Sequence, residues 1–138
     1  MTHIEEAGEI LDAATGVTLR RFETGRSPLA VSYDRDGKRF AVSQGDDGLG
    51  VHAASGELVG TVKLSFPMKA SFSADGERIA CADLKGGVTI VKVASLAVER
   101  RLPLKGVLPA FGAFSPVEAR LLATRDSDGL IELHDLAP

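Results

Sequence analysis

The chain has 138 residues and a formal net charge of −3, with 44% hydrophobic, 25% charged and 5% aromatic residues. This balance is typical of one globular domain over residues 1–138 and excludes a disordered, collagen-like or disulfide-rich chain. Neither nucleic acid nor a membrane is expected as a partner, because the chain is mildly acidic and has no apolar run of membrane-spanning length. The N-terminal residues do not resemble a secretory signal, so we expect a cytoplasmic location.

The first predicted element is a leading strand within residues 9–22. Glu9–Gly16 matches segments that recur later in the chain, and Gly8 disfavours a helix at this point. A second run, Val17–Phe22, has the composition of a strand that closes a four-stranded unit. Residues 9–12 are the part of this segment for which the repeat pattern gives no clear structural role.

Three repeats then follow, at spacings of 39 and 42 residues. Each begins with an aromatic residue, Tyr33, Phe72 or Phe114, and aligns without gaps over sixteen positions. We set the repeats at about 17–56, 57–96 and 97–138. A proline precedes each aromatic residue by five positions, an arginine follows it by six, and a glycine closes the match: Pro28, Pro67 and Pro109; Arg39, Arg78 and Arg120; Gly48, Gly87 and Gly129.

Each repeat contains four short strand patterns separated by turns rich in Asp and Gly. The runs after the prolines, such as Leu29–Tyr33, are small, branched or aromatic, so we expect strands buried on both faces. Asp36-Gly37 and Asp75-Gly76 supply the positive φ that tight hairpins require. No segment keeps an apolar period of 3.6 residues over three turns. The fold class is therefore all-β, and four antiparallel strands every 40 residues or so are typical of propeller blades.

The repeat resembles two propeller families. Gly25-Arg-Ser-Pro28 followed by Asp36-Gly-Lys-Arg39 is similar to the YVTN-type repeat, and Phe72-Ser-Ala-Asp-Gly76 is similar to the WD40 repeat. The resemblance covers roughly residues 9–136. It departs from WD40 in that no Trp-Asp pair is present and Gly25-Arg26 stands near the usual Gly-His pair. Of the family's hydrogen-bonded set, the resemblance retains Asp47 with Ser43 and Asp128 with Thr124.

The resemblance implies three blades of four antiparallel strands per chain, the last of them without an outer strand. Three blades cannot close a ring, whereas two chains supply six, so we expect a homodimer that forms a six-bladed ring. The alternatives are an excerpt or subunit of a larger propeller, or a sheet of another kind. The strands expected at the subunit interface contain Thr18, Leu19, Arg20, Arg21 and Phe22 on one chain, facing Ile131 and Leu133 on the other.

Candidate chemistry is sparse, and we predict no catalytic residue, no metal site and no cofactor. His3, His52 and His134 lack a metal-ligand spacing, and His52 and His134 occupy similar third-strand positions with solvated or core-edge side chains. We expect Cys81 to be a small buried hydrophobic residue. The repeated arginines, Arg39, Arg78 and Arg120, favour salt bridges between blades over a ligand clamp.

Two classes of function remain open at this stage. The first is a non-catalytic scaffold that binds itself and an unidentified protein or peptide; the second is an enzyme or cofactor carrier, possible because some propellers hold reactive groups in the channel. Scaffolding is favoured because the inner strands carry few polar groups. The loop face expected to bind a partner, or alternatively to line the channel mouth, contains Arg26, Phe66, Met68, Lys105 and Leu108.

Overall fold

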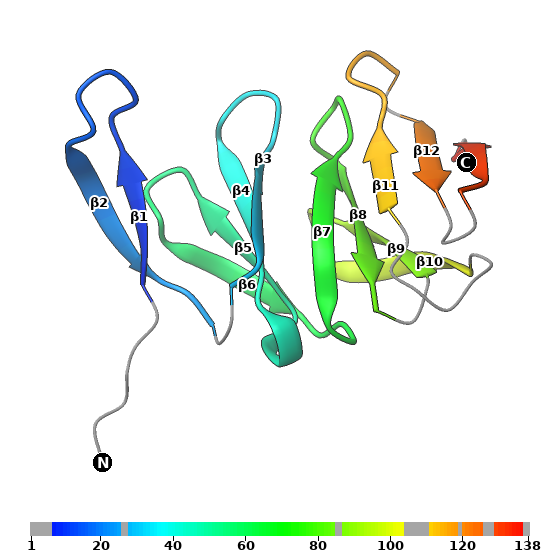
Figure 1. The fold of residues 1–138 in the computed structure, drawn as a ribbon, viewed down its shortest axis with the longest axis horizontal. Coiled ribbons are helices and arrows are strands. Elements are labelled where there is room, and N and C mark those ends of the chain that lie inside the picture. The colour runs from blue at the N-terminus through cyan, green and yellow to red at the C-terminus, as the bar shows by residue number, and fades with distance from the viewer. Residues whose placement is uncertain are drawn as a thin grey trace.

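A computed structural model describes residues 7–25, 28–84, 87–103, 111–118, 120–125 and 129–136. Within these ranges the regular structure is β, apart from one short 3-10 helix, and every strand pair is antiparallel. The strands form four sheets that follow one another along the chain (Figure 1). The all-β class expected from the repeats is confirmed.

The N-terminal hairpin is the first sheet and consists of β1 (Ala7–Leu11) and β2 (Thr18–Glu23). Its turn is stabilised by the Asp12 carboxylate, which accepts hydrogen bonds from the amides of Ala14 at 2.9 Å and Thr15 at 3.0 Å. Gly16 completes the turn at φ +73°, a conformation that favours glycine. The leading segment is thus a strand, as Gly8 and the repeat match indicate.

Two four-stranded sheets come next. The first four-stranded sheet has the order β3 (Ala30–Tyr33), β4 (Arg39–Ser43), β5 (Leu49–Ala53), β6 (Leu58–Val62), with the 3-10 helix η1 (Gly45–Asp47) between β4 and β5. The second has the order β7 (Pro67–Phe72), β8 (Arg78–Asp83), β9 (Gly87–Lys92), β10 (Ala97–Pro103). Gly37 and Gly76 turn the chain between inner strands at φ +70° and +73°, as expected.

The C-terminal sheet contains, among the residues that the structure describes, β11 (Phe111–Phe114), β12 (Leu121–Arg125) and β13 (Ile131–Asp135). The described strands therefore form a hairpin, two complete four-stranded units and one three-stranded unit. This agrees with the blade count predicted from the sequence, including the third unit without an outer strand.

The sheets stack face to face, and two apolar cores lie between them. The core between the first and second four-stranded sheets joins Ala41, Leu49 and Val51 to Ile79 and Cys81, among others. The core between the second sheet and the C-terminal sheet joins alternate residues of the same strands to the next unit: Ala80, Ala82, Val88 and Ile90 to Phe114, Leu122 and Leu136. Because β8 and β9 lie between two neighbours, they are buried on both faces.

The expectation that the first strand of each repeat is buried on both faces is wrong: β7 is fully buried only at its two ends, and the departure is larger in β3. Its residues alternate between half-buried and exposed, and Val31 and Tyr33 are among the exposed large hydrophobic residues. The strands buried on both faces are instead the second and third of each complete unit. The cause lies in the stacking, since β3 is an edge strand and the hairpin covers only part of its sheet.

Candidate interaction surfaces

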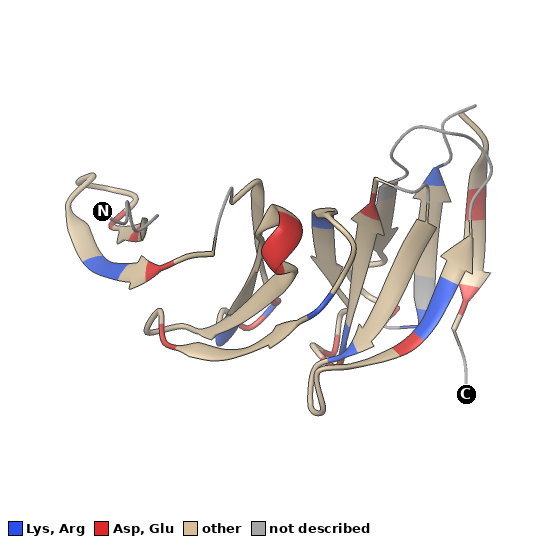
Figure 2. Cartoon of the chain, turned by 90° about the horizontal axis from the view of Figure 1, so that it is seen from below, with Lys and Arg blue, Asp and Glu red and all other residues tan. Residues whose placement is uncertain are grey.

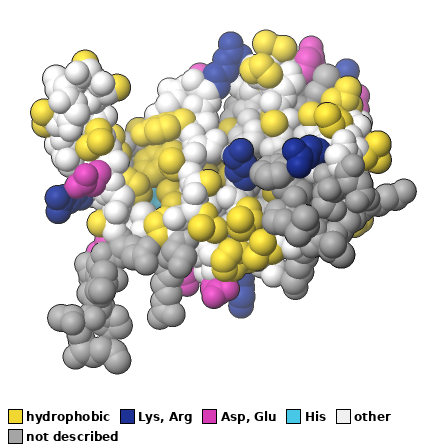
Figure 3. All heavy atoms as spheres, in the orientation of Figure 1, with side chains coloured by type: hydrophobic (Ala, Val, Ile, Leu, Met, Phe, Trp, Pro, Cys, Tyr) yellow, Lys and Arg dark blue, Asp and Glu magenta, His cyan; other side chains and the backbone are white. Residues whose placement is uncertain are grey.

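An apolar cleft separates the N-terminal hairpin from the first four-stranded sheet. It has a volume of about 440 Å³, and hydrophobic side chains gather in it, as the space-filling view shows (Figure 3). The hairpin contributes Ile10 and Phe22, and the sheet contributes exposed side chains of β3. The cleft is bounded by β1 and β3, each of which is an edge strand. The sheet's lining residues are Leu29, Ala30, Val31, Tyr33, Phe40 and Val42.

One aromatic cluster holds the hairpin against the first four-stranded sheet. The Phe22 ring lies 5.1 Å from the rings of both Phe40 and His52 in edge-on contacts. A β-carbon added at Gly56 would meet the Phe22 side chain, so the Gly56 turn also lies against this ring. The hairpin therefore contacts the sheet near β2, while the cleft stays open beside β1.

A second apolar surface lies at the other end of the molecule, on the C-terminal sheet. Leu133 is 79% exposed and Ile131 is 67% exposed, the largest values of any Leu or Ile that the structure describes. Their neighbour Leu136 is buried in the core on the opposite face. The exposed residues face away from the second sheet because side chains alternate along a strand. Both ends of the stack thus present unpartnered apolar surface.

The expected loop face is described only in part. Phe66 lies in the turn before β7 with φ +48°, and it is half-buried. Met68 lies in β7 itself, where its carbonyl is 3.3 Å from the Ser43 hydroxyl of the preceding sheet. Arg26, Lys105 and Leu108 lie outside the described residues.

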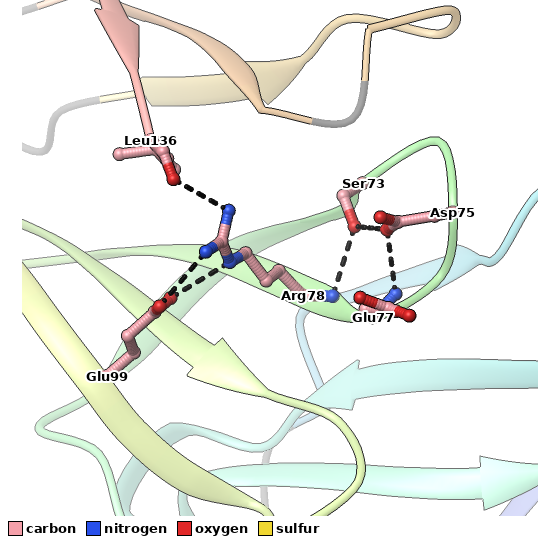
Figure 4. Close-up of polar contacts among 6 residues, drawn as sticks. All are labelled: Ser73, Asp75, Glu77, Arg78, Glu99 and Leu136. Carbon is pink, nitrogen blue, oxygen red and sulfur yellow. Dashed lines mark hydrogen bonds and ion pairs between the residues drawn. The ribbon is translucent and has the colours of Figure 1, made fainter. Parts of the chain in front are cut away.

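Arg78 contacts a carboxylate of its own sheet and a backbone carbonyl of the next sheet (Figure 4). Its guanidinium forms two 3.0 Å contacts with the carboxylate of Glu99 on β10 and donates a 3.0 Å hydrogen bond to the Leu136 carbonyl after β13. The ion pair thus lies within the second sheet, to which both β8 and β10 belong, and the contact with the next unit is the hydrogen bond to the Leu136 carbonyl. The predicted salt bridge between blades is therefore not what Arg78 forms. The related Arg120 pairs with Asp135 of its own sheet at 3.6 Å, with both side chains more than half exposed.

A turn beside Arg78 holds Asp75 in its charged form. Burial by itself raises the pKa of the Asp75 carboxyl, but hydrogen bonds from the Ser73 hydroxyl at 2.7 Å and the Glu77 amide at 3.0 Å outweigh it. The pKa is held below its ordinary value as a result, with the Arg78 charge contributing in the same direction. The Ser73 oxygen also accepts the Arg78 amide at 3.0 Å, so this carboxylate stabilises the turn that positions the arginine.

His134 is half-buried at the edge of the core, as expected, whereas His52 differs from the expected solvated or core-edge environment. His52 is fully buried, stacked on Phe40 with ring centroids 5.0 Å apart, and its Nδ1 donates to the Gly56 carbonyl at 3.1 Å. His134 lies opposite Leu122 as His52 lies opposite Phe40, and it is hydrogen-bonded to Thr124 at 2.8 Å. The two positions are therefore equivalent, as the repeat predicts. His3 lies outside the described residues.

Cys81 lies in the core, as expected, and burial raises the pKa of its thiol to about 12, with the nearby Asp83 charge adding to the effect. No group of three or more metal-ligating side chains occurs in the part of the chain that the structure describes. No helix within the described ranges is long and apolar enough to cross a membrane.

Charge is concentrated on the outer strands and turns (Figure 2). Basic residues lie on β2, which carries Arg20 and Arg21, and on β10, which carries Arg100 and Arg101. Arg21 pairs with Glu9 across the hairpin at 3.0 Å. β13 lies at the opposite end of the stack from β2 and carries the acidic residues Glu132 and Asp135.

The architecture matches solved propellers. No family model matches the chain, and no curated protein does. A crystal structure of the Cps50 (Swd1) β-propeller domain from Myceliophteria thermophila superposes with a TM-score of 0.72 over 83% of this chain, at 15% sequence identity. The fold is a β-propeller arc. The chain spans 36% of the length of that propeller chain, and the likeness at this identity extends to the fold alone.

Sequence reasoning located the end strands of the arc but missed the cleft. A blade without an outer strand leaves Leu133 at a sheet edge, as the sequence predicts. β2, which the sequence predicts as an outer strand without a partner in its own chain, instead pairs with β1. The cleft depends on how the hairpin docks through Phe22, and nothing in the repeat pattern encodes that angle. The one available signal was the apolar alternation of Leu29, Val31 and Tyr33 next to a leading strand without an assigned role.

Proposed function

We propose that this chain is a non-catalytic propeller module for protein–protein interaction, and that it assembles as a homodimer. The observation that carries the proposal is the pair of apolar surfaces at the two ends of the arc, the cleft beside β3 and the exposed face of β13. Exposed apolar surface of this extent marks an interaction site in a soluble protein. A partner built from β-strands fits best, because each surface is flanked by a strand edge.

A ring of two chains covers both surfaces with one kind of contact. In a head-to-tail arrangement the C-terminal sheet of one copy faces the N-terminal hairpin of the other, and the twofold relation repeats the contact. Two copies contribute four complete units and two composite ones, which gives six blades, within the range of four to eight found in propellers. The strands proposed from the sequence as the interface, with Thr18–Phe22 on one copy and Ile131 with Leu133 on the other, are the strands that this arrangement brings together.

The loop face is proposed as the surface that binds a further protein or peptide. Phe66 and Met68 contribute apolar side chains there that are only half-buried. Arg26, Lys105 and Leu108 belong to the same proposed face by their place in the repeat.

The test is the solution mass measured by light scattering across a range of concentrations. A homodimer gives twice the monomer mass of 14.5 kDa, and each copy retains β-rich circular dichroism. A stable monomer that does not aggregate, or a complex formed only with a different chain, contradicts the homodimer and favours the alternative of a subunit of a larger propeller. Stoichiometric metal or cofactor in the purified protein would instead favour the alternative of an enzyme or cofactor carrier.

A further inference from the structure

Two strands of this chain compete for one position in the proposed ring. The hairpin strand β1 and the last strand β13 occupy equivalent places in their sheets. β13 is the third strand of its sheet, and β1 lies beside the outer strand β2 as the third strands of the complete units lie beside theirs. The register of each sheet aligns Glu9, Ile10, Leu11 and Asp12 with Glu132, Leu133, His134 and Asp135. Three of these four positions are chemically alike: a glutamate, an aliphatic residue and an aspartate.

The alignment follows from a shift of register that occurs at the corresponding place in the hairpin and in the second sheet. In the hairpin the register shifts between Ile10 and Leu11, and in the second sheet the pairing shifts after Ile90 pairs with Arg100. Ile10 therefore corresponds to Ile90. On the other side, Thr124 pairs with Glu132 as Cys81 pairs with Thr89, so Leu133 also corresponds to Ile90.

We propose that β1 occupies, within one chain, the position beside β2 that β13 of a second copy takes in the ring. When the ring closes, β13 of the second copy displaces β1 from β2. The inference rests on the proposed homodimer and adds to it the strand that is exchanged. In the closed ring β11, β12 and β13 of one copy and β2 of the other form a composite four-stranded blade. The occupant of the cleft is thus the C-terminal sheet of a second copy of this chain.

Charge complementarity supports the pairing of β13 with β2. In the hairpin Glu9 lies opposite Arg21 and forms a 3.0 Å ion pair with it. The same register places Glu132 of a second copy opposite Arg21 and Leu133 of that copy opposite Arg20. Glu132 of the second copy therefore takes the place that Glu9 holds opposite Arg21 within one chain.

The apolar surfaces also match. Ile90 faces the following sheet and packs against Phe114 and Leu122 in the core. Ile10 faces the first four-stranded sheet across the cleft, in the same sense. The equivalent Leu133 faces open solvent in one chain, at 79% exposure. Placed beside β2 of a second copy, Leu133 takes the position of Ile10, and β11 and β12 fill the cleft next to β3.

The burial of β1 and β13 indicates which of these two strands is displaced more easily. β13 is continuous with Leu136, which is 1% exposed in the core and whose carbonyl accepts the Arg78 hydrogen bond. Removing β13 from its sheet would extract that side chain. β1 pairs only with β2 among the described strands, and its residues alternate between exposed and half-buried. β1 is therefore the strand that costs less to displace.

A matched pair of substitutions tests this competition. Leu133→Asp places a charge where the second copy must bury an aliphatic side chain, so the dimer dissociation constant rises about ten-fold or more. Ile10→Asp at the equivalent position weakens only the internal competitor, so the dissociation constant falls, by about three-fold or more, because a larger fraction of the chain becomes competent to bind. The measurement is sedimentation equilibrium on the full chain. Circular dichroism confirms that both variants stay folded.

A disulfide experiment identifies the paired strands directly. The variant Arg20→Cys, Leu133→Cys is oxidised and analysed on a non-reducing gel, with each single variant as the control. These positions lie in β2 and β13, and β2 and the C-terminal sheet are at opposite ends of the stack (Figure 1), so the expected product is a covalent dimer. Ile10→Cys, Leu133→Cys tests the other arrangement, in which β1 stays in place and β13 adds to its free edge.

The outcomes separate the inference from the function on which it rests. A dimer that Ile10→Asp weakens, or that crosslinks through positions 10 and 133 instead of 20 and 133, overturns the strand exchange and leaves the homodimer standing. A monomer at every concentration, with no crosslink in either double variant, overturns the homodimer and the exchange together. A dimer that crosslinks through positions 20 and 133 and is tightened by Ile10→Asp supports both.

Discussion

The Arg78 guanidinium joins elements that are far apart in the sequence. It contacts Glu99 on the outer strand of its own sheet and the Leu136 carbonyl of the next unit. Both charged side chains are about four-fifths buried, at 20% and 17% exposure, so solvent screens the pair only weakly. Loss of either partner leaves the other one largely buried without its counterion.

Arg78→Met is therefore expected to lower the free energy of unfolding by about 2 kcal/mol, because Glu99 and the Leu136 carbonyl both lose a charged donor. The measurement is urea denaturation followed by circular dichroism. The matched control is Arg120→Met, whose 3.6 Å pair with Asp135 is mostly solvated and contributes about 0.5 kcal/mol or less. Equal losses in the two variants would contradict a bridging role for Arg78.

The Cys81 thiol makes stability depend on alkaline pH. Its pKa is raised from 9.0 to about 12 by burial, so the native state keeps the proton while the unfolded state loses it above pH 9. Fewer protons bound to the unfolded state mean that stability falls as pH rises, by about 1 kcal/mol at pH 10 for this group. Below about pH 8 the group contributes almost no pH dependence, because the thiol is protonated in both states.

The check compares the wild type with Cys81→Ala at pH 7 and pH 10. The decline in unfolding free energy between these pH values should be smaller in the variant, since other titrating groups affect both proteins alike. The wild-type thiol should also react with a thiol reagent only at the rate of unfolding. Rapid reaction in the native state would show that Cys81 is accessible, contrary to its 1% exposure.

At the scale of elements, the strands divide into those packed on two sides and those packed on one. β8 and β9 have neighbours on both faces, whereas β1 has only β2 and the open cleft. Amides in β1 should exchange with deuterium about ten-fold or more faster than those in β8 and β9, because opening β1 exposes little apolar surface. Peptide-resolved hydrogen exchange measures this. Protection of β1 equal to that of β8 would contradict its loose attachment.

The repeat predicts elements better than it predicts their surroundings. The aromatic, arginine and glycine positions set the strands and turns because each acts locally, as Gly37 and Gly76 do through positive φ. Exposure of β3 was not predictable in this way, since the run Leu29–Tyr33 resembles the corresponding runs of the later repeats. The two strands differ in degree because their neighbours differ: β7 packs against a complete sheet and buries Pro67 and Phe72, while β3 faces a hairpin and has no fully buried residue. Burial at an end of an array depends on contacts that no single repeat contains.

Contacts outside the repeat also explain why His52 is buried. Its position equals that of His134, so the repeat gives both residues the same place in a sheet. Only the docking of Phe22 from the hairpin encloses His52 between two aromatic rings. The sequence therefore predicted the strand position of this side chain, and the packing of a separate element determined its burial.

At the scale of the whole molecule, an arc is stable to the extent that its ends are covered. The stack has two internal cores between sheets, and its first and last faces are apolar where the structure describes them. The proposed homodimer would add further cores of the same kind at those faces. Folding and association would then be linked, since unfolding one chain would also uncover the ends of the other.

Linkage predicts a thermal midpoint that rises with protein concentration. For a ring of two 138-residue chains the increase should be about 2 °C for each ten-fold rise in concentration, since mass action adds to the free energy of the assembled state. Differential scanning calorimetry measures it. Leu133→Asp should remove the dependence, because the exposed β13 face no longer buries an aliphatic side chain. Leu58→Asp, an exposed leucine on the outer strand β6, should keep it. A midpoint independent of concentration in the wild type would mean that the open faces of this chain are not covered by a second copy.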